Sequence, residues 1–328
     1  MNATSNYVDG QWSEAETGET IDVTDPANPS DVVARYQRSS AEDATRAVEA
    51  ASDAAEAWAN TPGPERGSIL REAGKILDDR TDELTEQLVS EEGKARAEAA
   101  GEVQRAVDIF YYFAAKASDL GGTVKGASGR NTNLYTREEP VGVAALITPW
   151  NYPIAIPAWK LAPALAAGNT VVLKPASVAP GPVIALAEAL DEAGLPDGVL
   201  NVVTGPGSEV GTEFIEHEGT DAVSFTGSSY VGEMVYDQAT ENGKRVQTEL
   251  GGKNPTLVAS SADPGEAADV VATGGFGTTG QSCTACSRAI VHDDVYDDFV
   301  AELVGRAESV DIGPGLEHEM GPQVNQDE

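Results

Sequence analysis

The residues best suited to covalent chemistry lie in one short segment, residues 280–286, whose sequence is Gly-Gln-Ser-Cys-Thr-Ala-Cys. It contains the only two cysteines of the 328-residue chain, Cys283 and Cys286. A thiol that follows a Gly-Gln turn, with small hydroxyl residues beside it, is easy for another molecule to approach. Three interpretations are open: a buried structural pair, a metal-binding or redox Cys-x-x-Cys motif, and a covalent nucleophile.

The metal and redox interpretations find little support elsewhere in the sequence. A structural zinc site needs four ligands, and the three histidines of the chain show no ligand spacing. A thioredoxin-like cysteine pair is expected near an early strand-helix-strand unit rather than at position 283. We therefore predict no metal site. A nucleophile and a buried structural cysteine remain, and the exposed turn favours the nucleophile.

Three polar residues elsewhere could take part in such chemistry. Asn151 could donate its side-chain amide to an oxyanion, or it could simply cap a helix. Lys174 follows an apolar run and could bind ribose hydroxyls or a phosphate, although surface lysines at strand ends are common. Glu249 precedes two glycines and could act as a general base if it lies near the thiol. Taken alone, it is one of 54 acidic residues.

Two glycine-rich turns are candidates for binding phosphate. Residues 205–211 resemble a dinucleotide fingerprint that includes Gly207, but the spacing is one residue too long, and a plain strand-to-helix turn is at least as good an interpretation. The second candidate is Gly227 and Ser228, with Gly232 one turn later. Neither turn is decisive alone.

These residues follow the strands of a predicted parallel sheet. From Val141 onward, apolar segments alternate with helical patterns, which is typical of a doubly wound α/β fold. The predicted strands are residues 141–147, 170–173, 198–203 and 222–225, and the predicted helices are residues 155–167, 183–193, 209–216 and 230–241. Ligands bind such sheets at the carboxyl ends of the strands. We therefore expect the residues just after each strand to form the site.

The flanking regions have other patterns. Residues 7–38 predict short strands with a turn at Asp9-Gly10, and four helices are expected between Ser40 and residue 120. Residues 121–141 form either a protruding hairpin or an ordinary surface loop, and the residues alone slightly favour the loop. Residues 251–328 predict a further strand-and-helix unit that contains the cysteine turn.

Composition excludes several partner classes. The net charge is −33, from 54 acidic and 21 basic residues, and the acids are spread along the chain. Such a field disfavours binding to nucleic acid and to anionic membranes. It is either an ordinary acidic surface or an adaptation to a high-salt cytosol, and the scarcity of lysine favours the adaptation. No apolar run reaches the length of a membrane span, and the N-terminus lacks a signal-peptide pattern. We therefore expect a soluble, cytoplasmic protein.

Five motifs in chain order resemble the signature series of the aldehyde dehydrogenase superfamily. They are Pro149-Trp150-Asn151-Tyr152-Pro153, Lys174-Pro175, Phe225-Thr226-Gly227-Ser228, Glu249-Leu250-Gly251-Gly252-Lys253 and Gly280-Gln281-Ser282-Cys283. The resemblance covers essentially the whole chain. It implies a doubly wound, Rossmann-like cofactor domain built from residues 1–120 and 142–250. It also implies an incomplete α/β catalytic domain at residues 251–328, and a role in oligomerisation for the hairpin at residues 121–141.

The resemblance also implies roles for individual residues. Cys283 would add to an aldehyde to give a thiohemiacetal, and the Asn151 side chain and the Cys283 amide would stabilise the oxyanion. Hydride would then pass to nicotinamide, and Glu249 would activate the thiol, the hydrolytic water, or both. Several residues would bind the cofactor, with Gly207 near its adenine end: Trp150, Lys174, Ser177, Gly207, Gly227, Ser228 and Gly232.

Two departures from the family pattern matter. Many NAD-preferring members have glutamate three residues after the lysine, whereas this chain has Ser177, so the cofactor is NADP or NAD. The family chain normally continues well beyond this length. The sequence therefore resembles a truncated member, with homo-oligomers expected only at full length.

The resemblance implies that the substrate is a small aldehyde. The segment from Ile154 to Pro163 and the residues around Cys283 are similar to dehydrogenases of 2,5-dioxopentanoate, also called α-ketoglutaric semialdehyde. Succinic semialdehyde and other aldehydes are the alternatives. A catalytically inactive nucleotide-binding module and a thiol esterase are alternative functions.

Overall fold

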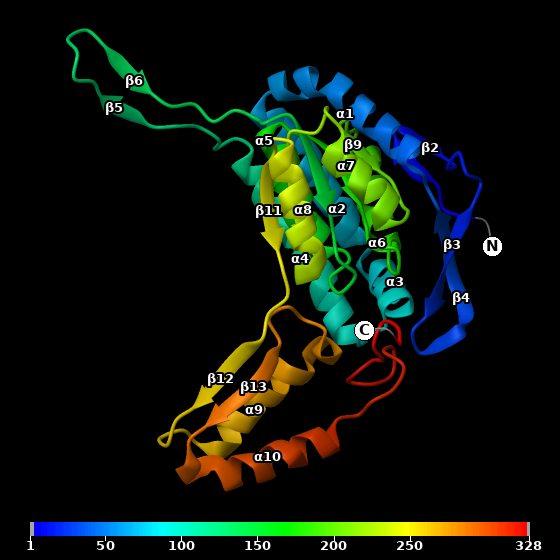
Figure 1. Ribbon diagram of the computed structural model, residues 1–328, viewed down its shortest axis with the longest axis vertical. Coiled ribbons are helices and arrows are strands. Elements are labelled where there is room, and N and C mark those ends of the chain that lie inside the picture. Colours follow the sequence, from blue (N-terminus) through cyan, green and yellow to red (C-terminus); the bar gives the residue numbers. More distant parts are fainter. Residues whose placement is uncertain (1–2, 327–328) are drawn as a thin grey trace.

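A twisted seven-stranded sheet forms the centre of the molecule in the computed structural model, which describes residues 3–326 (Figure 1). Its strand order is β11-β10-β7-β8-β9-β1-β2. The strands are β1 (Asn6–Val8), β2 (Gln11–Ser13), β7 (Val143–Ile147), β8 (Thr170–Lys174), β9 (Leu200–Val202), β10 (Ala222–Thr226) and β11 (Arg245–Glu249). The last five are parallel, and β1 pairs antiparallel with β9. The predicted doubly wound α/β fold is confirmed.

Helices cover both faces of this sheet. One face packs against α1 (Ala41–Asn60), α7 (Thr212–Glu216) and α8 (Ser229–Glu241) through a buried cluster that includes Val48, Phe214 and Val235. The other face packs against α2 (Gly63–Asp79), α3 (Thr81–Glu92), α4 (Arg96–Lys116), α5 (Ala155–Ala167) and α6 (Gly181–Glu192). Burial of both faces explains why strands β7 and β8 are continuous apolar runs rather than alternating ones.

Turn and cap residues in the sequence explain where the N-terminal strands and the first long helix lie. Asp9 and Gly10 both have positive φ, 50° and 69°, as the tight turn between β1 and β2 requires. Strands β3 (Thr20–Asp25) and β4 (Asn28–Gln37) form a separate antiparallel hairpin. Ser40 is the N-cap of α1, and the Asp43 carboxylate accepts a 2.9 Å hydrogen bond from the Ser40 amide.

A two-stranded hairpin extends away from the sheet (Figure 1). It consists of β5 (Val124–Gly126) and β6 (Asn133–Tyr135). Its apolar side chains are exposed: Val124 is 87% and Tyr135 is 69% exposed. A surface loop is therefore not the conformation of this segment. Its role in oligomerisation stays a prediction.

The C-terminal part forms a second, smaller layer. It contains β12 (Asn254–Val258), β13 (Cys286–Val291), α9 (Pro264–Phe276) and α10 (Tyr296–Ser309). The two strands are parallel and pack with both helices around Phe299 and Val258. The chain then returns to the first part of the molecule, where the carbonyl of Gly315 accepts a hydrogen bond from the amide of Arg96. The division into domains at residues 120, 142 and 250 stays a prediction.

The structure differs from the sequence expectations at three places. Strand β11 ends at Glu249 and was not predicted, because its charged and polar residues resemble a loop. Helix α9 extends to Phe276 and includes Gly274 and Gly275, although glycine has a low helix propensity. The helix predicted at residues 209–216 begins with a π-helical turn, Gly207–Gly211.

Candidate active site

Cys283 is exposed and lies just after an unusual backbone turn. Three consecutive residues, Thr278, Thr279 and Gly280, have φ of 51°, 56° and 73°. The left-handed region is unfavourable for β-branched residues such as threonine, so neighbouring contacts must hold this turn. Cys286 is half-buried at the start of β13, and its sulfur lies 3.1 Å from Thr256 Oγ1. The two thiols are therefore in different environments, and both are free.

Asn151 lies beside the cysteine turn although it is 130 residues away in the chain. Its side-chain Nδ2 donates a 2.6 Å hydrogen bond to the carbonyl of Gln281, two residues before Cys283. Asn151 follows β7, at the carboxyl end of the sheet. The Asn151 Oδ1 atom is buried without a hydrogen-bond partner, so the hydrogen bond from Nδ2 alone fixes the orientation of the side-chain amide. The structure thus brings the candidate oxyanion donor into contact with the segment that carries the candidate nucleophile.

Buried ionic groups that the sequence did not reveal support this arrangement. Lys94 is 1% exposed; its Nζ donates to the carbonyl of Asn151 at 2.8 Å and pairs with Glu102 at 2.5 Å. Glu102 also accepts hydrogen bonds from the amides of Ile154 and Ala155, at the start of α5. In the sequence, Lys94 and Glu102 are two of many charged residues in a segment with the pattern of an ordinary charged helix. Nothing else in the sequence indicates that they support the site.

Glu249 lies at the end of β11, and no hydrogen bond joins it to Cys283 among the described contacts. Its backbone carbonyl accepts from the amide of Gly227 at 3.1 Å. Its carboxylate accepts from Gln247 Nε2 at 3.2 Å. Glu249 therefore lies against the Gly227–Ser228 turn, and its action on the thiol stays a prediction.

Lys174 and Ser177 form a second group at the carboxyl end of β8. Lys174 is 5% exposed, and its Nζ donates to the carbonyl of Pro175 at 2.7 Å. Burial lowers the pKa of Lys174 to about 8. A Cβ on Gly207 would lie 3.9 Å from Lys174 Cε, and Ser177 Oγ donates to the carbonyl of Gly205 at 3.0 Å. Lys174, Ser177 and Gly207 thus lie together, as expected.

A third group lies at the start of α8. Ser228 is the N-cap of this helix, and its Oγ accepts from the amide of Val231 at 3.3 Å. A Cβ on Gly227 would lie 2.6 Å from the ring of Phe225, so no other residue fits this turn without movement. Trp150 is half-buried in the loop after β7, the strand that lies between β10 and β8.

Gly232 has a different environment from the other cofactor-binding candidates. It is buried on α8, and its amide donates to the carbonyl of Ser228 within the helix. A Cβ here would lie 2.1 Å from Leu250 Cδ2. Helix-to-sheet packing accounts for this glycine, and direct contact with a cofactor stays a prediction.

These groups together fit a dinucleotide. The buried Lys174 ammonium has a backbone carbonyl as its hydrogen-bond partner and no carboxylate within ion-pair distance among the described residues. It is therefore suited to hydroxyl or phosphate oxygens. The N-terminus of α8 adds amide donors and a positive dipole end at the same edge of the sheet.

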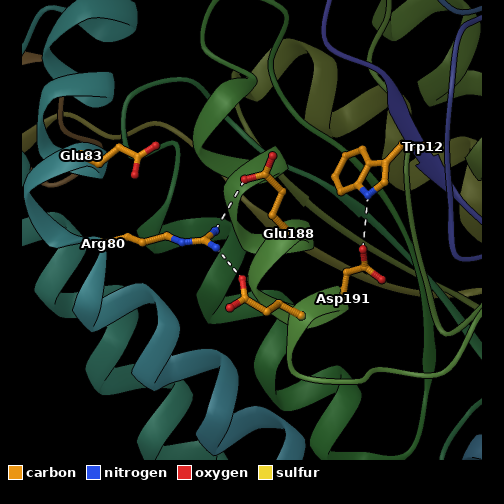
Figure 2. Close-up of a pocket in the computed structure, with 6 residues that line it drawn as sticks. Trp12, Arg80, Glu83, Glu188 and Asp191 are labelled. Atoms are coloured by element: carbon orange, nitrogen blue, oxygen red, sulfur yellow. Dashed lines mark hydrogen bonds and ion pairs between the residues drawn. The ribbon is translucent and has the colours of Figure 1, made fainter.

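Two hollows of the described surface lie away from these residues. One is lined by Trp12, Arg80 and acidic side chains of α3 and α6, where Arg80 pairs with Glu188 and Glu192 (Figure 2). Within the described part of the chain there is no group of three or more His, Cys, Asp or Glu residues that could hold a metal ion. No helix among those residues is long and apolar enough to cross a membrane.

Comparison with known proteins identifies the relatives of this chain. The family model described as "Aldehyde dehydrogenase family" matches residues 12–328. The α-ketoglutarate semialdehyde dehydrogenase of Haloferax volcanii is 79% identical over 98% of this chain and 67% of the relative. The α-ketoglutaric semialdehyde dehydrogenase of Bacillus subtilis is 42% identical over 98% of this chain and 66% of the relative. The chain thus spans about two thirds of the length of these curated relatives.

Solved structures agree with this result. A 3,6-anhydro-L-galactose dehydrogenase in complex with NAP superposes with a TM-score of 0.95 and 36% identity, over 99% of this chain and 69% of that one. An aldehyde dehydrogenase of Bacillus cereus in complex with NAD+ superposes with a TM-score of 0.96 and 35% identity, over 99% of this chain and 67% of that one. The fold, the order of the motifs and the family match lead to one conclusion: the chain belongs to the aldehyde dehydrogenase family.

Proposed function

We propose that this chain carries the cofactor-binding and nucleophile-bearing part of an NAD(P)-dependent dehydrogenase that oxidises 2,5-dioxopentanoate to the dicarboxylate. One observation carries the proposal: the Asn151 amide is bonded to the carbonyl of Gln281, beside Cys283. This contact lies two residues from Cys283, and it supports the pairing of an oxyanion donor with a thiol nucleophile that aldehyde chemistry at a cysteine requires. The names of the Haloferax and Bacillus relatives support the choice of substrate.

The chain's own residues supply the nucleophilic steps. The Cys283 thiolate adds to the aldehyde carbon, and the carbonyl oxygen becomes an oxyanion stabilised by Asn151 Nδ2 and the Cys283 amide. A bound nicotinamide cofactor would supply the acceptor for the hydride that leaves this carbon. Glu249 takes a proton from the water that hydrolyses the resulting thioester, and the Cys283 thiolate is the leaving group.

Lys174, Ser177 and Gly207 would hold the adenosine end of the cofactor. Trp150, Gly227 and Ser228 would hold the pyrophosphate at the start of α8. A neutral Ser177 does not repel a 2′-phosphate, so the site accepts NADP as well as NAD. Structural neighbours bound to NAP and to NAD+ support both possibilities.

The test is NAD(P)H formation at 340 nm with purified protein and a panel of aldehydes. The panel contains 2,5-dioxopentanoate, succinic semialdehyde and an uncharged aldehyde, with Cys283→Ala as the control. We expect the largest kcat/KM for 2,5-dioxopentanoate and no activity in Cys283→Ala. Because the chain spans about two thirds of its relatives, the same assay is run on a version extended to their full length.

Each alternative function gives a distinct result in this assay. Ester hydrolysis without NAD(P)H formation, in both the 328-residue and the extended protein, would identify a thiol esterase instead. Cofactor binding without either activity in both would identify an inactive nucleotide-binding module. A higher kcat/KM for succinic semialdehyde would reassign the substrate and leave the reaction class intact.

We also propose that the hairpin β5–β6 pairs with another copy of the chain in a homo-oligomer. The exposed Val124 and Tyr135 and the projection of the hairpin from the sheet support this role (Figure 1). Deletion of residues 123–136 is expected to lower the molar mass measured by light scattering. An unchanged mass would assign the contact to another surface.

A further inference from the structure

Helix α4 presents two glutamates, one helical turn apart, to the two loops that form the candidate site. Glu98 and Glu102 are separated by four positions, so they lie on the same face of the helix. Glu98 contacts the cysteine turn, and Glu102 contacts the Asn151 loop. Neither glutamate belongs to the motifs that identify the family in this sequence.

Glu98 forms a hydrogen bond with the turn where its unfavourable left-handed backbone begins. Its Oε1 accepts a 2.6 Å hydrogen bond from the amide of Thr278, the first of the residues with left-handed backbone. The Thr278 hydroxyl also lies 3.2 Å from Tyr152 Oη. A turn with two left-handed threonines in succession persists only when its surroundings hold it. Glu98 provides an ionic hydrogen bond, the strongest kind available to a backbone amide.

Glu102 holds the other loop in the same way. It accepts from the amides of Ile154 and Ala155, both at 3.0 Å, and pairs with the buried Lys94. Lys94 donates in turn to the carbonyl of Asn151. The Asn151 side chain then reaches Gln281, which closes a ring of contacts from α4 through both loops and back.

We propose that Glu98 is a positioning residue for the nucleophile: it holds the Thr278–Gly280 turn against the Asn151 loop that Glu102 and Lys94 fix. The role rests on the proposed function, in which Cys283 is the nucleophile and Asn151 the oxyanion donor. Loss of Glu98 leaves the thiol in place but removes its alignment with the Asn151 amide.

Two reactions of Cys283 distinguish the alignment of its thiol with the Asn151 amide from the general reactivity of the thiol. With 4-nitrophenyl acetate, the thiolate attacks the ester carbonyl, an oxyanion forms and nitrophenolate leaves, so the rate depends on the oxyanion donor. With iodoacetamide, the thiolate displaces iodide and no oxyanion forms. Both rates are measured across pH 6–9 in a Cys286→Ala background, so that Cys283 is the one thiol that reacts.

We expect Glu98→Ala to lower the acylation rate by about tenfold or more, with the alkylation rate changed less than about twofold. Glu98→Gln retains a side-chain oxygen that accepts from Thr278 and is expected to recover most of the acylation rate. Asp108→Ala, which removes an exposed carboxylate from the same helix, is the matched control and should change neither rate.

An unchanged ratio of acylation to alkylation in Glu98→Ala would overturn the positioning role while leaving the proposed function intact. Equal losses of both rates, or equal losses in Glu98→Ala and Glu98→Gln, would also overturn it. A parent protein whose Cys283 is not acylated faster than its Cys283→Ala variant would instead refute the nucleophile itself.

Discussion

At the scale of single residues, burial gives Lys174 properties that its place in the sequence does not show. The side chain is buried beside the Gly207 turn and bonds to a backbone carbonyl instead of a carboxylate. Burial of an uncompensated ammonium is unfavourable, and it lowers the pKa of Lys174 to about 8. A group kept at such a cost to stability is consistent with a role in ligand binding.

Lys174→Met is therefore expected to stabilise the protein and weaken cofactor binding. Below pH 8 the lysine is charged in both the folded and the unfolded protein, so the burial penalty is fully present. The penalty disappears as pH rises from about 8 to 10.5, because only the folded form has then lost its proton. At pH 7 we expect a gain on the order of 2 kcal/mol, since loss of the bond to Pro175 offsets part of the benefit.

Denaturant unfolding of both proteins at pH 7 and pH 10 measures this difference, and fluorescence titration with NADP measures binding. The stability gain should be clearly smaller at pH 10. A gain that is equal at both pH values would show that packing of the methionine, and not removal of the charge, is responsible.

We expect Ser177 to determine which cofactor the site prefers. Its Oγ lies beside the Gly205 carbonyl, in the same group as Lys174. A glutamate at this position would accept hydrogen bonds from ribose hydroxyls and repel a 2′-phosphate. Ser177→Glu is therefore expected to lower the NADP/NAD ratio of kcat/KM by about tenfold or more. Ser177→Gln, similar in size but uncharged, is the control, and an unaltered ratio in Ser177→Glu would exclude this position as the determinant.

At the scale of elements, the contact between α8 and β11 sets the position of the Ser228 turn relative to Glu249. Gly232 on α8 packs against Leu250, which directly follows β11. The Gly227 amide donates to the carbonyl of Glu249. The helix that begins at the candidate phosphate site is thus held against the strand that carries the candidate base.

Gly232→Ala tests this contact. A methyl group there would lie 2.1 Å from Leu250 Cδ2, so we expect a loss of about 1–3 kcal/mol of folding stability. Gly101→Ala, on α4 with nothing within 4 Å of its added methyl group, is the control and is expected to gain about 0.5–1 kcal/mol. Thermal and denaturant unfolding measure both. If the Gly232→Ala variant were more stable than the parent protein, the space between α8 and Leu250 would have room for a methyl group.

At the scale of the whole molecule, charge is the dominant feature. A net charge of −33 produces repulsion between acidic groups, which are spread along the chain. Dissolved salt screens exposed charges beyond about 3 Å at about 1 M ionic strength. The relative from Haloferax volcanii, at 79% identity, is consistent with a high-salt source.

We therefore expect the melting temperature to rise by more than about 5 °C between about 0.1 M and about 2 M KCl. Calorimetry or circular dichroism measures this shift. Sucrose at matched osmolality serves as an uncharged control and should have a smaller effect. A melting temperature that does not respond to KCl would remove the interpretation of the acidic surface as an adaptation to salt.

Much of the fold was evident from the sequence because it depends on local patterns. Apolar runs such as Val143–Ile147 specify buried parallel strands, and the Ser40 cap specifies where α1 begins. Strand β11 was missed because its exposed residues, Arg245, Gln247 and Glu249, carry no apolar pattern, and only pairing with β10 makes this segment a strand. The inclusion of Gly274 and Gly275 in α9 is not evident from the sequence, because glycine has a low helix propensity.

The sequence by itself determined the family, the order of the strands along the chain and the types of residue available for chemistry, because these are recorded in local motifs and periodicity. Only the tertiary structure decided that the Asn151 amide reaches Gln281 and that Lys94, Glu98 and Glu102 support the two loops. Such contacts join residues up to 180 positions apart. Their geometry depends on how helices and strands pack, which no single segment of the sequence specifies.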